Sequence, residues 1–290
     1  MEQFIALTVI GLANGAILAL AAMGFVLIFK ATGVINFAQG AFLMVGAYVV
    51  WFLTTEVGLH WALGIAGALI VAAGLGIGVE RSVLRPLVGQ PIISVIMVTI
   101  GLNELLRGLV QVAWGTRPRS FPEFFPEGTL LVLGARLPLD RLYAIGLAAV
   151  TLALLTIFFQ RSREGIAMRA VADDQQAALT MGISVRRVFA VSWVLAACSA
   201  VIGGMLVANL IGVSGFVIDF GLLVFPVVIL GGLDSIPGAV LGGLIIGLLI
   251  TFTGAYIGGG LQTVIPYLVL VGVLLVKPYG LFGQVRIERV

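Results

Sequence analysis

The chain has 290 residues, of which 61% are hydrophobic and only 10% are charged, and its formal net charge is +3. A soluble domain carries roughly 25% charged residues, so this chain lacks the polar surface that a protein of its size needs in water. Its apolar runs are continuous and near the roughly 20 residues that cross a bilayer as a helix, which favours an α-helical membrane protein over a β-barrel.

Nine apolar runs are candidate membrane spans. They predict an all-α, polytopic transmembrane bundle of about eight spans, forming a single transmembrane domain over residues 1–290. The first run starts at Phe4 without a basic stretch or a small-residue cleavage site, so we expect a retained helix rather than a signal peptide. Cys198 and His60 are the only residues of their types and predict neither a disulfide framework nor a metal site. The runs are 4–29, 41–55, 61–79, 91–114, 142–159, 188–212, 221–233, 237–256 and 262–276.

Two of these runs, 41–55 and 221–233, are shorter than the usual spanning length. Glycine and polar residues border both, among them Asn36 and Gln39 before the first and Asp234 after the second. Paired interrupted segments in the two halves of a chain point to a transport site and to an inverted repeat. We therefore predict that at least one of 31–55 and 221–240 is a broken or re-entrant helix beside a pathway.

Lys and Arg residues are distributed unevenly between the two sides that these spans define. Placing the larger group in the cytoplasm puts the C-terminus inside and, if every run crosses, the N-terminus outside. A single re-entrant segment would reverse the N-terminal side. The inner group is Lys30, Arg81, Arg85, Arg161, Arg163, Arg169, Arg186, Arg187, Lys277, Arg286 and Arg289, and the outer group is Arg117, Arg119, Arg136 and Arg141.

Small-residue repeats are frequent in this glycine-rich chain. Gly11-x-x-x-Gly15, Gly238-x-x-x-Gly242 and Gly243-x-x-x-Gly247 have the spacing that lets helix backbones approach closely in lipid. The alternative is that glycine is simply common in membrane helices.

Glu104 and Arg107 are the one clear pair of charged residues inside a predicted span. Their spacing of three places them on one helical face, where they can neutralise each other. We keep two interpretations open: a structural pair that faces the bundle interior, and a pair that contacts substrate.

Residues 160–187, called the coupling segment below, carry five arginines and the pattern of a short amphipathic helix. Arg169, Asp173, Gln176 and Thr180 form a polar stripe opposite apolar positions, and Gly182 stands where a C-terminal glycine cap belongs. Such a helix is suited to docking on a partner. The alternative is a basic loop that only fixes topology.

Several motifs are absent from the sequence. No Gly-x-x-x-x-Gly-Lys-[Ser/Thr] phosphate loop, no His/Cys/carboxylate cluster and no catalytic serine motif occurs. We therefore expect no enzymatic activity, no catalytic residues, no metal and no cofactor, and we expect any energy for transport to come from a partner or from an ion gradient.

Part of the coupling segment resembles the coupling loop of branched-chain amino acid ABC permeases of the LivH type. The similar residues are Arg163-Glu164-Gly165-Ile166-Ala167-Met168-Arg169-Ala170-Val171-Ala172-Asp173-Asp174, Ala177-Ala178 and Gly182-Ile183. Further similar stretches run in order along almost the whole chain. They are Gly33-Val34-Ile35-Asn36-Phe37-Ala38-Gln39-Gly40, Gly46-Ala47-Tyr48, Thr99-Ile100-Gly101-Leu102, Trp114-Gly115, Leu230-Gly231-Gly232, Ile236-Pro237-Gly238-Ala239 and Lys277-Pro278-Tyr279-Gly280-Leu281-Phe282-Gly283.

This resemblance implies a permease subunit of an ABC importer for branched-chain or other small apolar amino acids, located in a bacterial inner membrane. It implies as partners a second related permease, two cytoplasmic ATPase subunits and a periplasmic binding protein, besides membrane lipid and without nucleic acid. Asn36, Phe37, Gln39 and Glu104 are expected to line the pathway. Arg169, Ala172, Asp173, Gln176 and Gly182 are expected to couple to the ATPases.

Two departures from the family pattern bear on the substrate. Gln39 stands where the family often has histidine, and Glu104 is an acid where an apolar residue is expected. Importers of urea and short amides share the architecture, so such a substrate stays an alternative. The other alternative is an autonomous carrier or channel that needs no ATPase.

Overall fold

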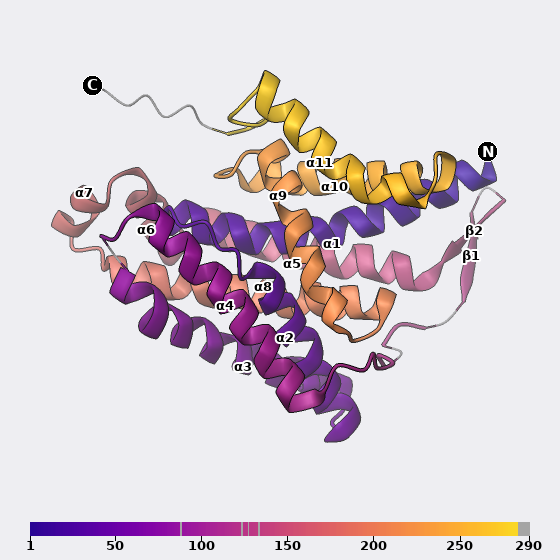
Figure 1. Ribbon diagram of the computed structural model, residues 1–290, viewed down its shortest axis with the longest axis horizontal. Helices are drawn as coiled ribbons and strands as arrows, with labels where there is room; N and C mark the ends of the chain where they lie inside the picture. The colour runs from indigo at the N-terminus through magenta and orange to yellow at the C-terminus, as the bar shows by residue number, and fades with distance from the viewer. Residues whose placement is uncertain (88, 123, 127, 133, 284–290) are drawn as a thin grey trace.

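The computed structural model describes residues 1–87, 89–122, 124–126, 128–132 and 134–283, and Figure 1 shows them as a bundle of helices. Seven of the described helices are long and apolar enough to cross a membrane. The predicted α-helical membrane fold is therefore confirmed. The helices are α1 (Glu2–Thr32), α2 (Gln39–Trp51), α3 (Trp61–Val79), α4 (Ile92–Trp114), α5 (Leu139–Arg161), α6 (Arg163–Asp173), α7 (Gln175–Thr180), α8 (Val185–Ile211), α9 (Phe220–Gly231), α10 (Ile236–Tyr256) and α11 (Gly259–Val276).

Shorter elements extend or join these helices. A π-helical segment, Phe52–Glu56, continues α2, and a second one, Glu80–Leu84, followed by a 3-10 turn, Arg85–Leu87, continues α3. A 3-10 turn, Gly215–Asp219, precedes α9. Strands β1 (Thr129–Val132) and β2 (Ala135–Pro138) pair antiparallel, a hairpin within 115–141 that sequence patterning did not predict.

Helix α1 is the centre of the bundle, and α10 and α8 pack along it. The glycine repeats lie at these contacts. A methyl group added at Gly247 of α10 would overlap the backbone of Gly15 in α1, and one added at Gly242 would overlap the backbone of Val227 in α9. The repeats thus permit close backbone approach, as small residues do in membrane helices.

The two short runs belong to spans that are not continuous α-helices. Between α1 and α2 the chain is non-helical at 33–38, and Asn36 and Ala38 in this stretch are completely buried. The other short span, Gly215–Gly231, consists of a 3-10 turn and α9, which contains Pro226. The prediction of a broken helix is confirmed, and seven of the described helices reach spanning length.

The two ends of the bundle carry different sets of basic residues. Lys30 donates a hydrogen bond of 3.0 Å to the carbonyl of Asp234, which places the end of α1 beside the start of α10 and near the coupling segment. At the opposite end, Arg119, which follows α4 in the chain, pairs with Glu56 at the end of the α2 segment at 3.5 Å. By the positive-inside rule, the end with the coupling segment is cytoplasmic. Arg286 and Arg289 of the predicted inner group lie outside the described residues.

The coupling segment forms two helices rather than the single helix that the polar stripe predicts. Asp174 has an extended backbone, with φ −155° and ψ 110°, and its carboxylate accepts hydrogen bonds from the amides of Gln176 and Ala177 at 2.8 and 3.0 Å. An aspartate that caps a helix in this way interrupts the preceding one. The break divides the predicted stripe, with Arg169 and Asp173 on α6 and Gln176 on α7.

Gly182 ends α7 as expected. Its φ of 79° lies in the left-handed region, its amide donates to the carbonyl of Leu179, and the amide of Ile183 donates to the carbonyl of Ala178. These two bonds form a Schellman motif, in which glycine is the favoured residue because it has no Cβ. The predicted glycine cap is confirmed.

Candidate translocation site

The N-termini of α2 and α9 meet inside the bundle at a contact between two glycines. A side-chain carbon added to Gly221 would overlap the backbone of Gly40, and one added to Gly40 would overlap the carbonyl of Ile218. Neither helix receives a side-chain cap at its N-terminus. The partial positive charges of two helix ends therefore lie close together, an arrangement that favours a nearby anionic group.

From this contact the two helices run toward opposite ends of the bundle. Helix α2 continues to Glu56, which pairs with Arg119 at the outer end. Helix α9 ends at Gly231, where the amides of Leu281 and Phe282 donate to the carbonyls of Leu230 and Gly231. Two half-length helices pointing in opposite directions are the element that membrane transporters use beside a substrate site.

The non-helical stretch before α2 is held by side chains rather than by regular backbone pairing. The Asn36 side-chain oxygen accepts the amide of Ala38 at 3.0 Å. The Thr99 hydroxyl of α4 lies 3.3 Å from both the carbonyl of Ile35 and the amide of Phe37. These contacts supply partners that the interrupted backbone needs away from water.

A cavity of about 310 Å³, called the translocation cavity below, lies beside the Gly40–Gly221 contact. Its lining is mixed, since apolar side chains from α4 and α9 share it with amide, carboxylate and guanidinium groups. The lining residues are Phe37, Gly40, Ile100, Asn103, Glu104, Arg107, Ile218, Asp219, Gly221 and Leu222. Two of the four predicted pathway residues, Phe37 and Glu104, therefore lie in this lining.

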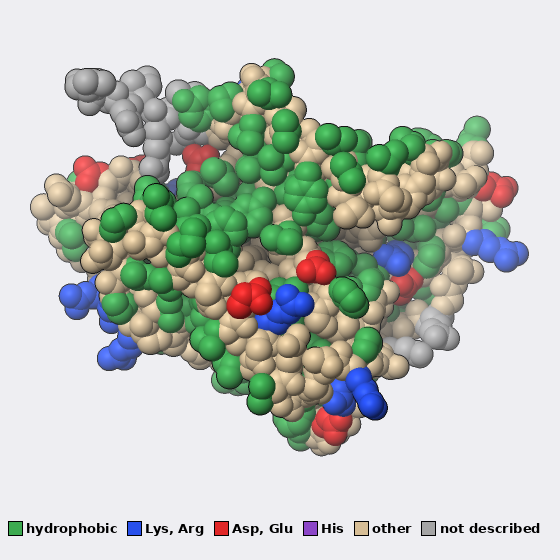
Figure 2. All heavy atoms as spheres, in the orientation of Figure 1, with side chains coloured by type: hydrophobic (Ala, Val, Ile, Leu, Met, Phe, Trp, Pro, Cys, Tyr) green, Lys and Arg blue, Asp and Glu red, His purple; other side chains and the backbone are tan. Residues whose placement is uncertain are grey.

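Glu104 and Arg107 do not face the bundle interior, which corrects the structural interpretation of the pair. Their closest charged atoms are 4.0 Å apart, and their side chains are 62% and 42% exposed. The amide of Asn103 donates to the Glu104 carboxylate at 3.3 Å. Figure 2 shows acidic and basic side chains gathered near the middle of a largely apolar face. The pair is available for contacts from outside the subunit.

Asn36 and Gln39, the other two predicted pathway residues, are buried and do not line the cavity. Their side chains are 3.4 Å apart, from Asn36 Nδ2 to Gln39 Oε1. Gln39 Nε2 has no hydrogen-bond partner among the described residues. Both residues brace the start of α2, while Phe37 packs against Phe225 of α9 with ring centres 4.7 Å apart.

Asp219 and Asn103 are cavity residues that sequence patterning did not identify. Asp219 lies in the turn between two apolar runs, where it has the appearance of an ordinary loop acid. Its position before the broken span 221–233 was the available signal, because polar groups next to interrupted helices tend to serve the site.

The predicted coupling residues lie at the cytoplasmic end but do not share one role in the packing. Arg169 donates through Nη1 to the carbonyl of Phe159, and through Nη2 to that of Gln160 at 3.2 Å. A cation at these carbonyls complements the C-terminal dipole of α5. Ala172 is half-buried, whereas Asp173, Gln176 and Gly182 are exposed. Arg169 therefore joins α6 to α5 within the subunit.

Comparison with known proteins is consistent with this geometry. Residues 7–274 match the family described as the permease component of the branched-chain amino acid transport system. The chain belongs to this family. It is also 32% identical to the high-affinity branched-chain amino acid transport system permease protein LivH of Escherichia coli strain K12, over 97% of this chain and 96% of the relative.

A second relative comes from the same organism. The permease protein LivM of the E. coli high-affinity branched-chain amino acid transport system is 27% identical over 70% of this chain and 53% of its own length. Among solved structures, a chain of PsaBC from Streptococcus pneumoniae in complex with Fab covers 93% of this chain and 91% of its own, with a TM-score of 0.51 and 14% identity. That likeness concerns the fold alone.

Family membership and the seven spanning helices together describe a multi-pass inner-membrane transport subunit rather than an enzyme. The branched-chain permease family is one of ABC transporters, so subunits of an ABC transporter are the partners that it implies.

Proposed function

We propose that this permease is one of two membrane subunits of an ABC importer that carries branched-chain or other small apolar amino acids into the cell. The observation that carries the proposal is the translocation cavity, where charges of both signs stand beside apolar walls and two uncapped helix N-termini. An amino acid with an apolar side chain has the complementary features: a carboxylate, an ammonium group and a hydrocarbon.

Each part of such a substrate has a matching group in the cavity. Arg107 and the N-terminus of α2 at Gly40 suit the carboxylate, because guanidinium and free backbone amides both bind carboxylates well. Glu104 and Asp219 suit the ammonium group. Phe37, Ile100 and Leu222 supply apolar surface for the side chain.

A second, related permease would complete the cavity. Glu104 lies halfway along α4, and ionisable side chains at that depth face protein or water rather than lipid. Its neighbours Leu105 and Leu109 are 58% and 56% exposed, so the charges stand within an apolar face. A protein partner over this face removes the charges from lipid and buries the leucines. The LivH and LivM relatives support a pair of different permeases.

Two cytoplasmic ATPases would dock on the coupling segment. Ile166, Leu179 and Met181 are exposed there, at 52%, 58% and 81%, although apolar side chains outside the membrane are usually covered. Through Arg169 a push on α6 would reach α5 directly. A periplasmic binding protein would deliver the substrate at the opposite end, where Arg117 and Arg119 lie.

Reconstitution tests this proposal. The chain is assembled in proteoliposomes with a related permease, ATPases and a binding protein from the same organism, and uptake of labelled leucine, urea and acetamide is compared. We expect ATP-dependent leucine uptake that requires every subunit. Uptake of urea or acetamide alone would contradict the amino-acid assignment, and leucine uptake by the chain without ATPases would contradict the importer.

A further inference from the structure

A second cavity, called the inner chamber below, lies on the cytoplasmic side of the non-helical stretch before α2. Its volume is about 180 Å³, and nine of its fourteen lining residues are apolar. Val34 and Ile35 come from that stretch, Val95 and Ile96 from the first two turns of α4, Trp193 from α8 and Gln175 from α7. No residue is shared with the translocation cavity.

The two cavities are arranged in series along the same two segments. On α4, Ile96 lines the inner chamber and Ile100 lines the translocation cavity, one helical turn further from the cytoplasm. On the non-helical stretch, Ile35 lines the first and Phe37 the second. A molecule that leaves the translocation cavity toward the cytoplasm along α4 therefore reaches the inner chamber next.

Between the cavities stands a contact formed by Ile35, Phe37 and Thr99, which we call the gate. Thr99 is completely buried, and its hydroxyl is within 3.3 Å of the Ile35 carbonyl and of the Phe37 amide. Its third contact is the carbonyl of Ile96 in its own helix, at 2.9 Å. Because the bonds to the stretch are long, they break at a lower cost than short ones.

We propose that the inner chamber is a second binding site for the transported amino acid, which holds its apolar side chain after it passes the gate. The proposal rests on the proposed function for the identity of the ligand. Its apolar lining suits a small hydrocarbon side chain, and its volume lies below the range typical of sites for larger ligands. Gln175 in its wall connects the chamber to the coupling segment, so movement of α7 changes its shape.

Thiol accessibility tests the chamber and the gate in the complete importer. In a Cys198→Ser background, Ile96→Cys and Ile100→Cys form a matched pair on one face of α4, and Met97→Cys, 60% exposed and in neither lining, is the control. A charged, membrane-impermeant thiol reagent is applied to right-side-out and inside-out vesicles. We expect modification of Ile96→Cys only from the cytoplasmic side and of Ile100→Cys only from the outside.

Leucine added to inside-out vesicles identifies the ligand. We expect saturating leucine to slow modification of Ile96→Cys at least about tenfold and to leave Met97→Cys unchanged, since occupied sites exclude the reagent. If leucine leaves the rate of Ile96→Cys modification unchanged, although the same variant imports leucine, the proposed binding site is overturned. Modification of Ile96→Cys and Ile100→Cys from the same side would overturn the separation into two cavities.

Two substitutions at Thr99 test the gate itself. Thr99→Val removes the hydroxyl with little change in volume, whereas Thr99→Ser keeps it. We expect Ile96→Cys to become reachable from the outside with Thr99→Val and to stay protected with Thr99→Ser. Identical patterns for the two variants would overturn the role of the hydroxyl. Sidedness needs no substrate, so absent leucine uptake would count against the proposed function and leave the gate testable.

Discussion

Glu104 and Arg107 illustrate how exposure decides between structural and functional interpretations of a charge pair. At 4.0 Å and with both side chains well exposed, the pair contributes at most about 1 kcal/mol to the stability of the isolated subunit. The isolated subunit therefore gives no structural reason for the pair. Its place in the lining of the translocation cavity supports the substrate contact that we propose for it.

We therefore expect Glu104→Gln and Arg107→Gln each to lower amino-acid uptake by about 10- to 100-fold, the effect of losing one hydrogen bond to a charged group. The thermal stability of the purified subunit should stay unchanged. Replacing both residues by leucine should also abolish uptake in a correctly assembled complex. Uptake that survives the double replacement would return the pair to a purely structural role.

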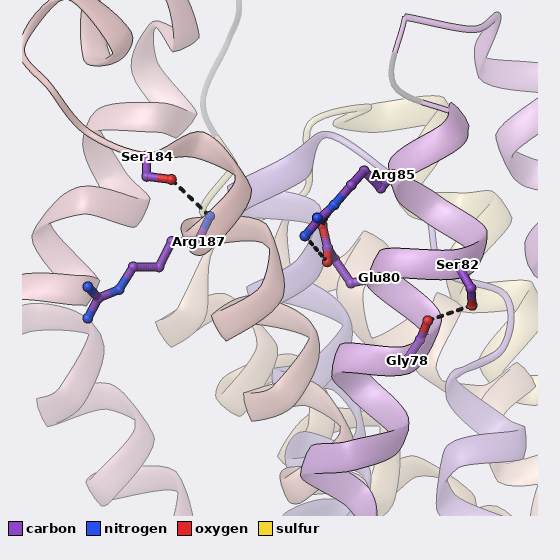
Figure 3. Close-up of polar contacts among 6 residues, drawn as sticks. All are labelled: Gly78, Glu80, Ser82, Arg85, Ser184 and Arg187. Carbon is purple, nitrogen blue, oxygen red and sulfur yellow. Dashed lines mark hydrogen bonds and ion pairs between the residues drawn. The ribbon is translucent and has the colours of Figure 1, made fainter.

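Glu80 and Arg85 form a pair of the opposite kind at the cytoplasmic end of α3. The Glu80 side chain is 2% exposed, and Arg85 binds both of its oxygens, at 3.2 and 2.8 Å, as Figure 3 shows. Arg85→Met leaves a buried carboxylate without a cation. We expect it to lower the free energy of unfolding in mixed detergent micelles by about 1–3 kcal/mol.

Arg81 supplies the control for this prediction. It has the same charge as Arg85, lies beside Glu80 in the preceding π-helical segment and is exposed, so Arg81→Met should change the free energy of unfolding by less than about 0.5 kcal/mol. Replacing both Glu80 and Arg85 by methionine should be milder than Arg85→Met alone, because no charge is stranded. Equal stability of the Arg85→Met variant and the wild type would contradict this account.

At the scale of elements, α6 and α7 act as a two-part connection between the cytoplasmic surface and the bundle. The Ser162 hydroxyl caps α6, Arg187 pairs with Glu164, and Arg169 binds the end of α5. In Figure 3 the Arg187 side chain extends to the left, away from the Glu80–Arg85 pair. Helix α6 is thus tied to both α5 and α8, whereas α7 projects beyond Asp174.

A proline in α6 should interrupt this connection. Ala172→Pro removes a hydrogen bond of the last turn and clashes one turn back, at a cost of about 3 kcal/mol. We expect the subunit to remain in the membrane while ATPase attachment weakens or ATP hydrolysis no longer drives uptake. The measurements are co-purification of the ATPases and uptake per ATP hydrolysed.

Arg163→Pro is the matched control, because it lies at the first position of the same helix. Proline is favoured there, and the preceding Ser162 already has the extended backbone that a following proline requires. It also removes an arginine of the basic segment. Normal coupling with Ala172→Pro, or equal defects in both variants, would favour a segment that only fixes orientation.

At the scale of the whole molecule, the apolar face around the translocation cavity predicts where the second permease sits. Leu105→Cys should react rapidly with a maleimide in the isolated subunit and at least about tenfold more slowly in the complete complex. Leu154→Cys of α5, 63% exposed in the subunit, is the control and should react equally in both. Unchanged reactivity of Leu105→Cys on assembly would place the partner elsewhere.

The sequence alone was sufficient to predict the helices but not to predict how the residues of the candidate site pack together. All nine apolar runs form helices, because continuous apolar length in lipid leaves the backbone no other way to satisfy its hydrogen bonds. The contact of Gly40 with Gly221 joins positions 181 residues apart, and no local pattern encodes it. The place of Asp219 in the cavity lining and the exposure of Glu104 depend on that contact, so neither could be predicted. Asp174, by contrast, is a typical N-cap residue, so the break after α6 was predictable.

The central position of α1 has a consequence for how the protein is made. Among the described helices α1 leaves the ribosome first, yet its Asn14 side chain bonds to Thr251, 237 residues later, at 3.2 Å. At about 5–20 residues per second, roughly 10 to 50 s pass before that partner exists. Throughout this interval α1, which is central in the finished bundle, must reside in lipid or with the insertion machinery. A chain cut short before α10 therefore leaves uncovered the surface of α1 that packs against α10.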